Sequence, residues 1–402
     1  MKKVLYINRI KILLILILLL LTFWTSLSHC FVLSKDMTQE EAEQKLQDSI
    51  KEQLDNIDFW GLEQLINSLN NDQKTIFGSS GFLDRVKQLL NGNFNSSNIF
   101  SAIMYLLIGE ITSFLPILAT VVGIATLCSL LSNLQINNKG TGNVIYFACY
   151  GAVILSVSVT VFYLVMLTKN TVNAMQTQIN LIFPILLGVL TAIGGTTSAA
   201  VYQPMVSVLS LVVSRIMVNI ILPLFIFGYI FNIIGNLSST IKLKKFTSFT
   251  SSMSKWLIGI IFTVFTAFMS IQGITASVHD GVSIKTAKFA ISHYIPIIGG
   301  YLSDGFNLIM AGSVLIKNAV GVAGLFLLAS TILAPIIKII VLILTLKLTA
   351  AILEPLANEG FSNFISETAK CLGMLIAIIL SVAFMYFIML LLVVCTGNYI
   401  WG

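Results

Sequence analysis

Charged side chains within long apolar runs are the first candidates for chemistry in this sequence. Such residues are Glu110, Arg215, Lys317, Lys338 and Lys347. A charge at membrane depth costs several kcal/mol unless it is paired, hydrated or able to reach the surface. We expect Lys338 and Lys347 simply to reach a membrane surface. Arg215 lies deeper in its run, which favours pairing or pore lining, with Glu110 as one possible partner.

A second candidate is the stretch from Gly299 to Gly321, which places polar residues among apolar neighbours. At 100° per residue, one helical stripe about 60° wide holds five small or polar residues, whereas Lys317 lies roughly 100° from its centre. The five are Gly300, Asp304, Asn307, Ala311 and Asn318. Asp304 and Lys317 are therefore not partners on one helix surface. The stripe predicts either close helix packing, since small residues let backbones approach, or the lining of a conduit.

Catalytic and metal-binding patterns are weak in this chain. The sequence has no GxxxxGK[ST] loop for phosphate, no HExxH pair for zinc and no GxSxG motif. His279 and His293 lack a further ligand at metal-binding spacing, so we expect structural or interfacial roles. Asp280 and Asp304 are the pair that an intramembrane protease would need, but each precedes glycine, as at helix starts and turns. We predict no enzyme activity, no metal and no cofactor.

The overall composition places these residues in a polytopic membrane protein. Of the 402 residues, 56% are hydrophobic and only 10% are charged, whereas a soluble domain is roughly a quarter charged. The net charge of +6 is unevenly spread, because residues 34–98 hold eleven acidic and six basic side chains. The basic balance elsewhere is therefore no sign of a nucleic-acid partner. Residues 34–98 also contain no cysteine, so no internal disulfide is expected there.

The chain divides into three parts by composition. Residues 1–30 have a basic start, an apolar core and a small polar end, which is typical of a signal peptide; an uncleaved signal anchor is the alternative. Residues 31–98 form an acidic segment with amphipathic helical periodicity, expected outside the cytoplasm. This segment is too small to bury much core alone, so we expect it to pack on its own membrane domain or on a partner. Residues 99–402 form the membrane domain.

The membrane domain contains eight apolar runs and is expected to be all-α. Since a span needs about 20 residues, we predict about seven or eight membrane helices. The runs are 99–132, 144–168, 179–200, 206–235, 257–279, 306–334, 336–356 and 372–396.

The direction of these crossings is constrained by a basic loop at 242–255. Basic loops are retained in the cytoplasm, so an odd number of crossings must separate this loop from an extracytoplasmic acidic segment. Four runs lie between them, and one is therefore expected not to cross. The candidates are the first run, which contains Glu110 and Pro116, and the glycine-rich run ending at residue 200, which could be re-entrant.

Three segments are more specific than hydropathy. They are "LTAIGGTTSAAVYQPM" (190–205), "IQGITASVHDGVSIKTAKFAISHYIPIIGGYLSDGFNLIMAGSVLIKNAVGVAGL" (271–325) and "KLTAAILEP" (347–355). These segments closely resemble the stage III sporulation protein AE family. The resemblance covers essentially the whole chain. It implies a multi-pass protein made in the mother cell of an endospore-forming bacterium and placed in the outer forespore membrane. Its expected role is in the transenvelope apparatus that supports forespore development and late forespore gene expression.

The same resemblance implies partners but no catalytic residues. The partners are other products of the stage III sporulation A operon, including the AA ATPase and the AG and AH ring proteins, and indirectly stage II sporulation protein Q. Two mechanisms stay open: a conduit or export-platform subunit whose polar stripe forms a gated path, and a non-transporting scaffold that assembles the rings. A secondary transporter is a third, which inverted repeats would favour.

Overall fold

The computed structural model describes residues 39–78, 81–92, 97–134, 139–237, 243–294 and 299–396. All regular structure within these ranges is helical, as the predicted fold class requires. The predicted signal at 1–30 lies outside the described residues. The chain divides into two compact units, Met1–Asp48 and Ser49–Gly402. Of the first unit, the structure describes residues 39–48, the start of helix α2 (Gln39–Asp55).

The acidic segment is helical where its periodicity predicts it. Beyond α2 it forms α3 (Trp60–Ser68), α4 (Asn71–Phe77) and α5 (Phe82–Leu90). The start of α4 is set by a capping box, in which the Asn70 side chain accepts from the Gln73 N–H and the Gln73 side chain accepts from the Asn70 N–H. Both α4 and α5 contact the long helix α11 (Gly299–Leu356). The part of the segment that belongs to the second unit therefore packs on its own membrane domain, which is one of the two arrangements expected.

The membrane domain is built from a few very long helices. These are α6 (Ser97–Leu134), α7 (Lys139–Ala192), α8 (Thr196–Ile216), α9 (Leu222–Leu237), α10 (Lys244–Tyr294), α11 and α12 (Glu359–Cys395), with the π-helical turn η1 (Met217–Ile221) joining α8 to α9. Among the described residues, six helical segments are long and apolar enough to cross a membrane. They are Ser101–Leu131, Val144–Ala192, Thr196–Leu237, Lys245–Ile271, Asn307–Leu356 and Glu359–Cys395.

Six segments are fewer than the seven or eight helices predicted, because two pairs of runs share a helix. The runs 144–168 and 179–200 are joined as far as Ala192 in α7, and the runs 306–334 and 336–356 are joined in α11. A dip in hydropathy does not end a helix: residues 169–178 are polar but contain no glycine or proline. Pro335 lies inside α11 without ending it.

The joined helices also remove the parity conflict. Three spans, rather than four, now separate the acidic segment from Lys244 and Lys245. α6 runs uninterrupted through Glu110 and Pro116. The glycine-rich segment after α7 does not re-enter as a broken run but forms the tight turn to α8, with Gly194 at a φ of 89°.

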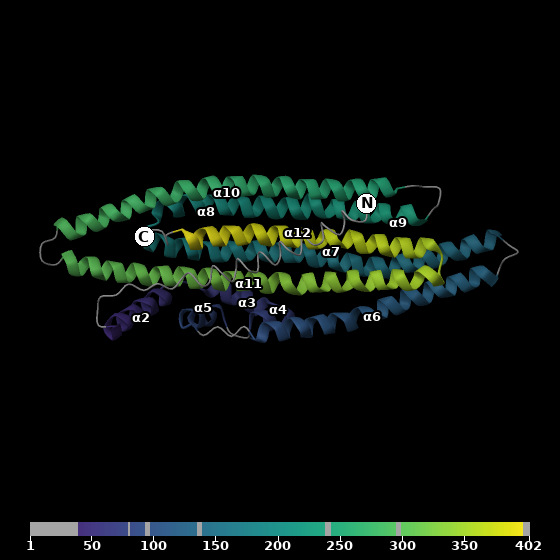
Figure 1. Cartoon of the computed structure of the whole chain (residues 1–402), viewed down its shortest axis with the longest axis horizontal. Helices are drawn as coiled ribbons and strands as arrows, with labels where there is room; N and C mark the ends of the chain where they lie inside the picture. The colour runs from purple at the N-terminus through teal and green to yellow at the C-terminus, as the bar shows by residue number, and fades with distance from the viewer. Residues whose placement is uncertain are drawn as a thin grey trace. The chain divides into compact units, whose positions relative to one another are not determined.

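α12 is enclosed by its neighbours and forms the core of the bundle. It contacts α7, α9, α10 and α11 (Figure 1). Its exposed residues are Glu359, Lys370, Gly373 and Cys395. Small residues of α11 allow this close packing, since Gly321 faces Val394 of α12 and Gly324 faces Leu390 of α12 and Ile182 of α7.

Candidate functional site

Lys338 of α11 is the centre of a three-residue ion-pair cluster. Its Nζ lies 3.1 Å from Oδ2 of Asp72 in α4 and 3.2 Å from Oε1 of Glu110 in α6. The Lys338 and Glu110 side chains are only 17% and 15% exposed, and partly buried pairs are screened less by salt than exposed ones. The sequence predicted that Lys338 simply reaches a membrane surface. The structure shows instead that Lys338 is paired. The cluster fastens the acidic segment to α6 and α11.

The same cluster corrects the predicted partner of Glu110. Glu110 pairs with Lys338, whereas Arg215 lies on α8 with its side chain exposed. Glu110 and Arg215, which the sequence suggested as possible partners, are thus not brought together. Asp72 was missed altogether, because it belongs to a segment that nothing in the linear pattern connects to residue 338.

Lys317 is fully buried at the end of α12. Its Nζ donates a hydrogen bond to the backbone carbonyl of Thr396, which caps that helix. The Thr396 hydroxyl lies 3.2 Å from the Tyr202 hydroxyl of α8. A cation at a helix C-terminus satisfies exposed carbonyls and opposes the negative end of the helix dipole. Lys317 therefore ties α11 to the end of α12, and α8 joins at the same point.

The predicted polar stripe on α11 is only partly described. α11 is continuous across Gly305, and Gly299, Gly300 and Asp304 lie in its first two turns. The Asp304 side chain lies outside the described part. Asp280 likewise has no described side chain, but it lies within the unbroken helix α10 rather than at a turn.

The described members of the stripe share one half-buried face. Asn307, Ala311 and Asn318 are all of intermediate exposure. Oδ1 of Asn307 is buried and has no hydrogen-bond partner among the described residues. A neighbouring face is covered by α2, because the Ser313 hydroxyl donates to Oε1 of Gln53 at 2.5 Å. The stripe is thus a partly covered polar face rather than a lipid-facing one.

Further buried polar contacts join helices at positions that sequence reasoning did not single out. Gln178 of α7 donates to the hydroxyl of Thr331 in α11. The Tyr386 hydroxyl of α12 donates to the Ser210 carbonyl of α8 at 3.3 Å. The sequence signal for these contacts is only a polar residue within an apolar run. Each contact is worth about 0.6–2 kcal/mol in membrane helices.

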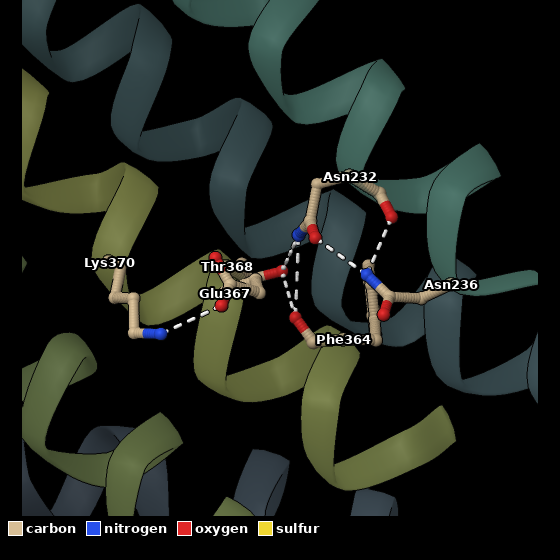
Figure 2. Close-up of polar contacts among 6 residues, drawn as sticks. All are labelled: Asn232, Asn236, Phe364, Glu367, Thr368 and Lys370. Atoms are coloured by element: carbon tan, nitrogen blue, oxygen red, sulfur yellow. Dashed lines mark hydrogen bonds and ion pairs between the residues drawn. The ribbon is translucent and has the colours of Figure 1, made fainter. Parts of the chain in front are cut away.

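A polar cluster also links α9 and α12 near the start of α12. Figure 2 shows Asn232 reaching across to α12, where its Nδ2 lies 2.9 Å from the Thr368 hydroxyl and 3.4 Å from the Phe364 carbonyl. Asn236, one turn along, donates to Oδ1 of Asn232 at 2.8 Å. The nearby Glu367–Lys370 pair, at 2.7 Å, lies within α12 and is more exposed. The cluster fixes the packing of α9 on α12.

The described side chains offer no group of three or more histidine, cysteine, aspartate or glutamate residues that could hold a metal ion. His279 and His293 lie outside that set. The described helices are therefore joined by polar contacts and capped, with an ion-pair cluster at Lys338 and a buried cation at Lys317.

Comparison with known proteins identifies a family model and a relative that match this chain. The family model described as stage III sporulation protein AE matches residues 81–397. A protein of Bacillus subtilis (strain 168) called "Stage III sporulation protein AE" is 26% identical over 315 residues, which cover 77% of this chain and 79% of the relative. No solved structure matches the chain. The matched range begins at α5 and includes every long helix. Lys338 of the ion-pair cluster lies within this range, whereas its partner Asp72 precedes the range.

Proposed function

Because the chain belongs to the stage III sporulation protein AE family, we propose that it is a membrane platform subunit of the apparatus that joins mother cell and forespore. The bundle lies in the outer forespore membrane, and the acidic segment faces the space between the two forespore membranes. The platform supports forespore development and late forespore gene expression, and its role is assembly or export rather than catalysis.

The observation that carries this proposal is the double ion pair of Lys338. One cation holds α4 of the acidic segment against both α6 and α11, so the segment is a fixed surface rather than a loose arm. A fixed surface loses little entropy when a partner binds. The partners we propose are other products of the stage III sporulation A operon, including the AA ATPase and the AG and AH ring proteins, and indirectly stage II sporulation protein Q.

A conduit through the subunit is the second candidate. It is favoured by the buried Oδ1 of Asn307, which has no hydrogen-bond partner among the described residues. A buried polar atom of this kind is commonly satisfied by water. The half-buried face of Asn307, Ala311 and Asn318 would then be hydrated. Lys317 is not part of this case, because it is fully buried against the end of α12.

A charge swap tests the platform. Lys338→Glu places three carboxylates together and should release α4, so the ring proteins should no longer co-purify and heat-resistant spores should be lost. The double variant Asp72→Lys with Lys338→Glu again has two acids around one base and should restore both. Lys370→Glu, which alters a more exposed pair, is the control and should leave both unchanged.

The same assay separates the two candidates. If Lys338→Glu abolishes spores while the ring proteins co-purify at the wild-type level, the platform proposal fails. Asp304→Asn should then be the informative variant: loss of forespore activity with intact assembly would favour the conduit.

A further inference from the structure

Gln178 of α7 carries a buried amide that is only half satisfied. The residue is 2% exposed, and its Nε2 donates to the hydroxyl of Thr331 in α11. Its Oε1 is buried and has no hydrogen-bond partner among the described residues. A buried acceptor without a donor costs free energy, so native structures rarely leave one unsatisfied.

The orientation of this amide is fixed by the hydroxyl that it meets. Oγ1 of Thr331 donates its single hydrogen to the Leu327 carbonyl, 3.0 Å away. This hydroxyl can therefore only accept from Gln178, and the amide atom turned toward it must be the nitrogen. A flipped amide would place Oε1 against an oxygen that has no hydrogen left to give. The group that needs a partner is thus an acceptor.

A second acceptor lies at the same place, on the backbone of α11. In an α-helix the Thr331 carbonyl accepts from the N–H four residues later. That residue is Pro335, which lies inside α11, and proline has no N–H. Because Gln178 contacts Thr331 itself, its Oε1 and this freed carbonyl are neighbours. Thr331 is fully buried, so bulk solvent does not reach the site.

Two neighbouring acceptors call for a molecule that donates twice. A water molecule has two hydrogens and no net charge, and buried waters commonly bridge polar groups of this kind. A hard cation takes about six oxygen ligands, far more than these two acceptors. The described side chains also include no group of three acidic, histidine or cysteine residues that could hold a metal ion. The chemistry of the site therefore favours water.

We infer that a water molecule is bound between α7 and α11, donating one hydrogen to Oε1 of Gln178 and the other to the Thr331 carbonyl. Ordered water is one of the ways in which membrane helices satisfy a carbonyl that proline has freed. The bound water accounts for a proline inside the unbroken helix α11, and it adds a bridge beside the direct Gln178–Thr331 contact. The site is independent of whether the subunit is a platform or a conduit.

Radiolytic labelling tests this site on the full chain in lipid nanodiscs. X-ray pulses split bound water into hydroxyl radicals, which oxidise the side chains beside it, and methionine sulfur is readily oxidised. Met175 lies nearly one turn before Gln178 in α7 and is fully buried. Met389 of α12 is equally buried and serves as the reference. Mass spectrometry measures the oxidation rate of both methionines in the same sample.

We expect Met175 to be oxidised several-fold faster than Met389. Gln178→Leu removes the buried acceptor and should lower the Met175 rate to that of Met389. Pro335→Ala supplies the missing N–H to the Thr331 carbonyl, leaves Gln178 in place and should also lower the Met175 rate. This second variant keeps the test decisive if Gln178→Leu does not fold.

Gly188→Ala, on an open face of α7, is the matched control and should leave the Met175 rate unchanged. Equal rates for Met175 and Met389 in the wild-type protein, which a cation at the site would also give, would overturn the inference. A Met175 rate that neither Gln178→Leu nor Pro335→Ala lowers would overturn it as well.

Discussion

Two lysines of α11 show how burial sets the role of a single residue. Lys338 is partly exposed and joins two carboxylates from α4 and α6. Lys317, nearly six turns earlier, is fully buried and donates to the carbonyl of Thr396, the residue that caps α12. A buried cation must keep its partners, since removing them leaves a charge without compensation. Lys317 therefore acts in packing, whereas Lys338 acts in joining separate parts of the chain.

Packing at single-residue scale is tightest at Gly321, where a Cβ would overlap Val394 of α12. Gly321→Ala should destabilise the protein by about 1–3 kcal/mol, because valine is branched at Cβ and cannot turn away easily. Gly373→Ala in α12 meets open space and should stabilise the helix by about 0.5–1 kcal/mol. Thermal unfolding in detergent compares the two. Equal midpoints would show that α11 and α12 do not pack as closely as described.

At the scale of elements, helix continuity and hydropathy are separate properties. α7 remains one helix where its exposed face turns polar at Lys169, because no residue there interrupts the backbone hydrogen bonds. It ends instead at Ile193–Gly195, where Gly194 takes a left-handed conformation and the chain turns back into α8. The turn sets the α7–α8 pairing, in which the Ser210 hydroxyl donates to Oδ1 of Asn180 at 3.3 Å.

This turn gives a prediction at element scale. Gly194→Ala should cost about 1–2 kcal/mol, because a side chain is strained at a φ of 89°. Gly188→Ala, six residues earlier on an open face of α7, is the matched control and should not destabilise. Thermal unfolding of both variants in detergent measures the difference. Unchanged stability of Gly194→Ala would mean that the turn adopts another conformation.

At the scale of the whole molecule, the number of crossings decides which surfaces share a compartment. Among the described residues, three candidate spans separate the acidic segment from Lys244 and Lys245, and six separate it from Cys395. If each candidate span crosses the membrane once, the even total predicts that the acidic segment and the end of α12 lie on the same side.

Single-cysteine chains test this topology. Asn91→Cys and the native Cys395, both exposed, should react with a membrane-impermeant thiol reagent in intact protoplasts of growing cells that make the protein before any forespore forms. Lys245→Cys, exposed at the start of α10, should react only after permeabilisation. The topology would be refuted by labelling of Asn91→Cys and Lys245→Cys from the same side, or by protection of Cys395 in these intact protoplasts.

Local sequence was sufficient for properties that depend on neighbours along the chain. Hydropathy identified a polytopic helical membrane protein, and periodicity predicted a helical acidic segment, in which α2, α3, α4 and α5 form. The resemblance drawn from residues 190–205, 271–325 and 347–355 led to the family that the comparison shows. Helical spacing places Lys317 away from the stripe that holds Asn307 and Asn318. In the structure Lys317 is fully buried, whereas both asparagines are half-buried.

Only the tertiary structure decided which charges meet and where helices continue. Lys338 finds Asp72 and Glu110, each more than two hundred residues away, and Glu110 does not pair with Arg215. Pairing depends on which helices lie together, and hydropathy carries no such information. The count of six spans rather than seven or eight has a similar cause, since a polar dip such as Lys169–Gln178 interrupts an apolar run without breaking the hydrogen bonds that make one helix.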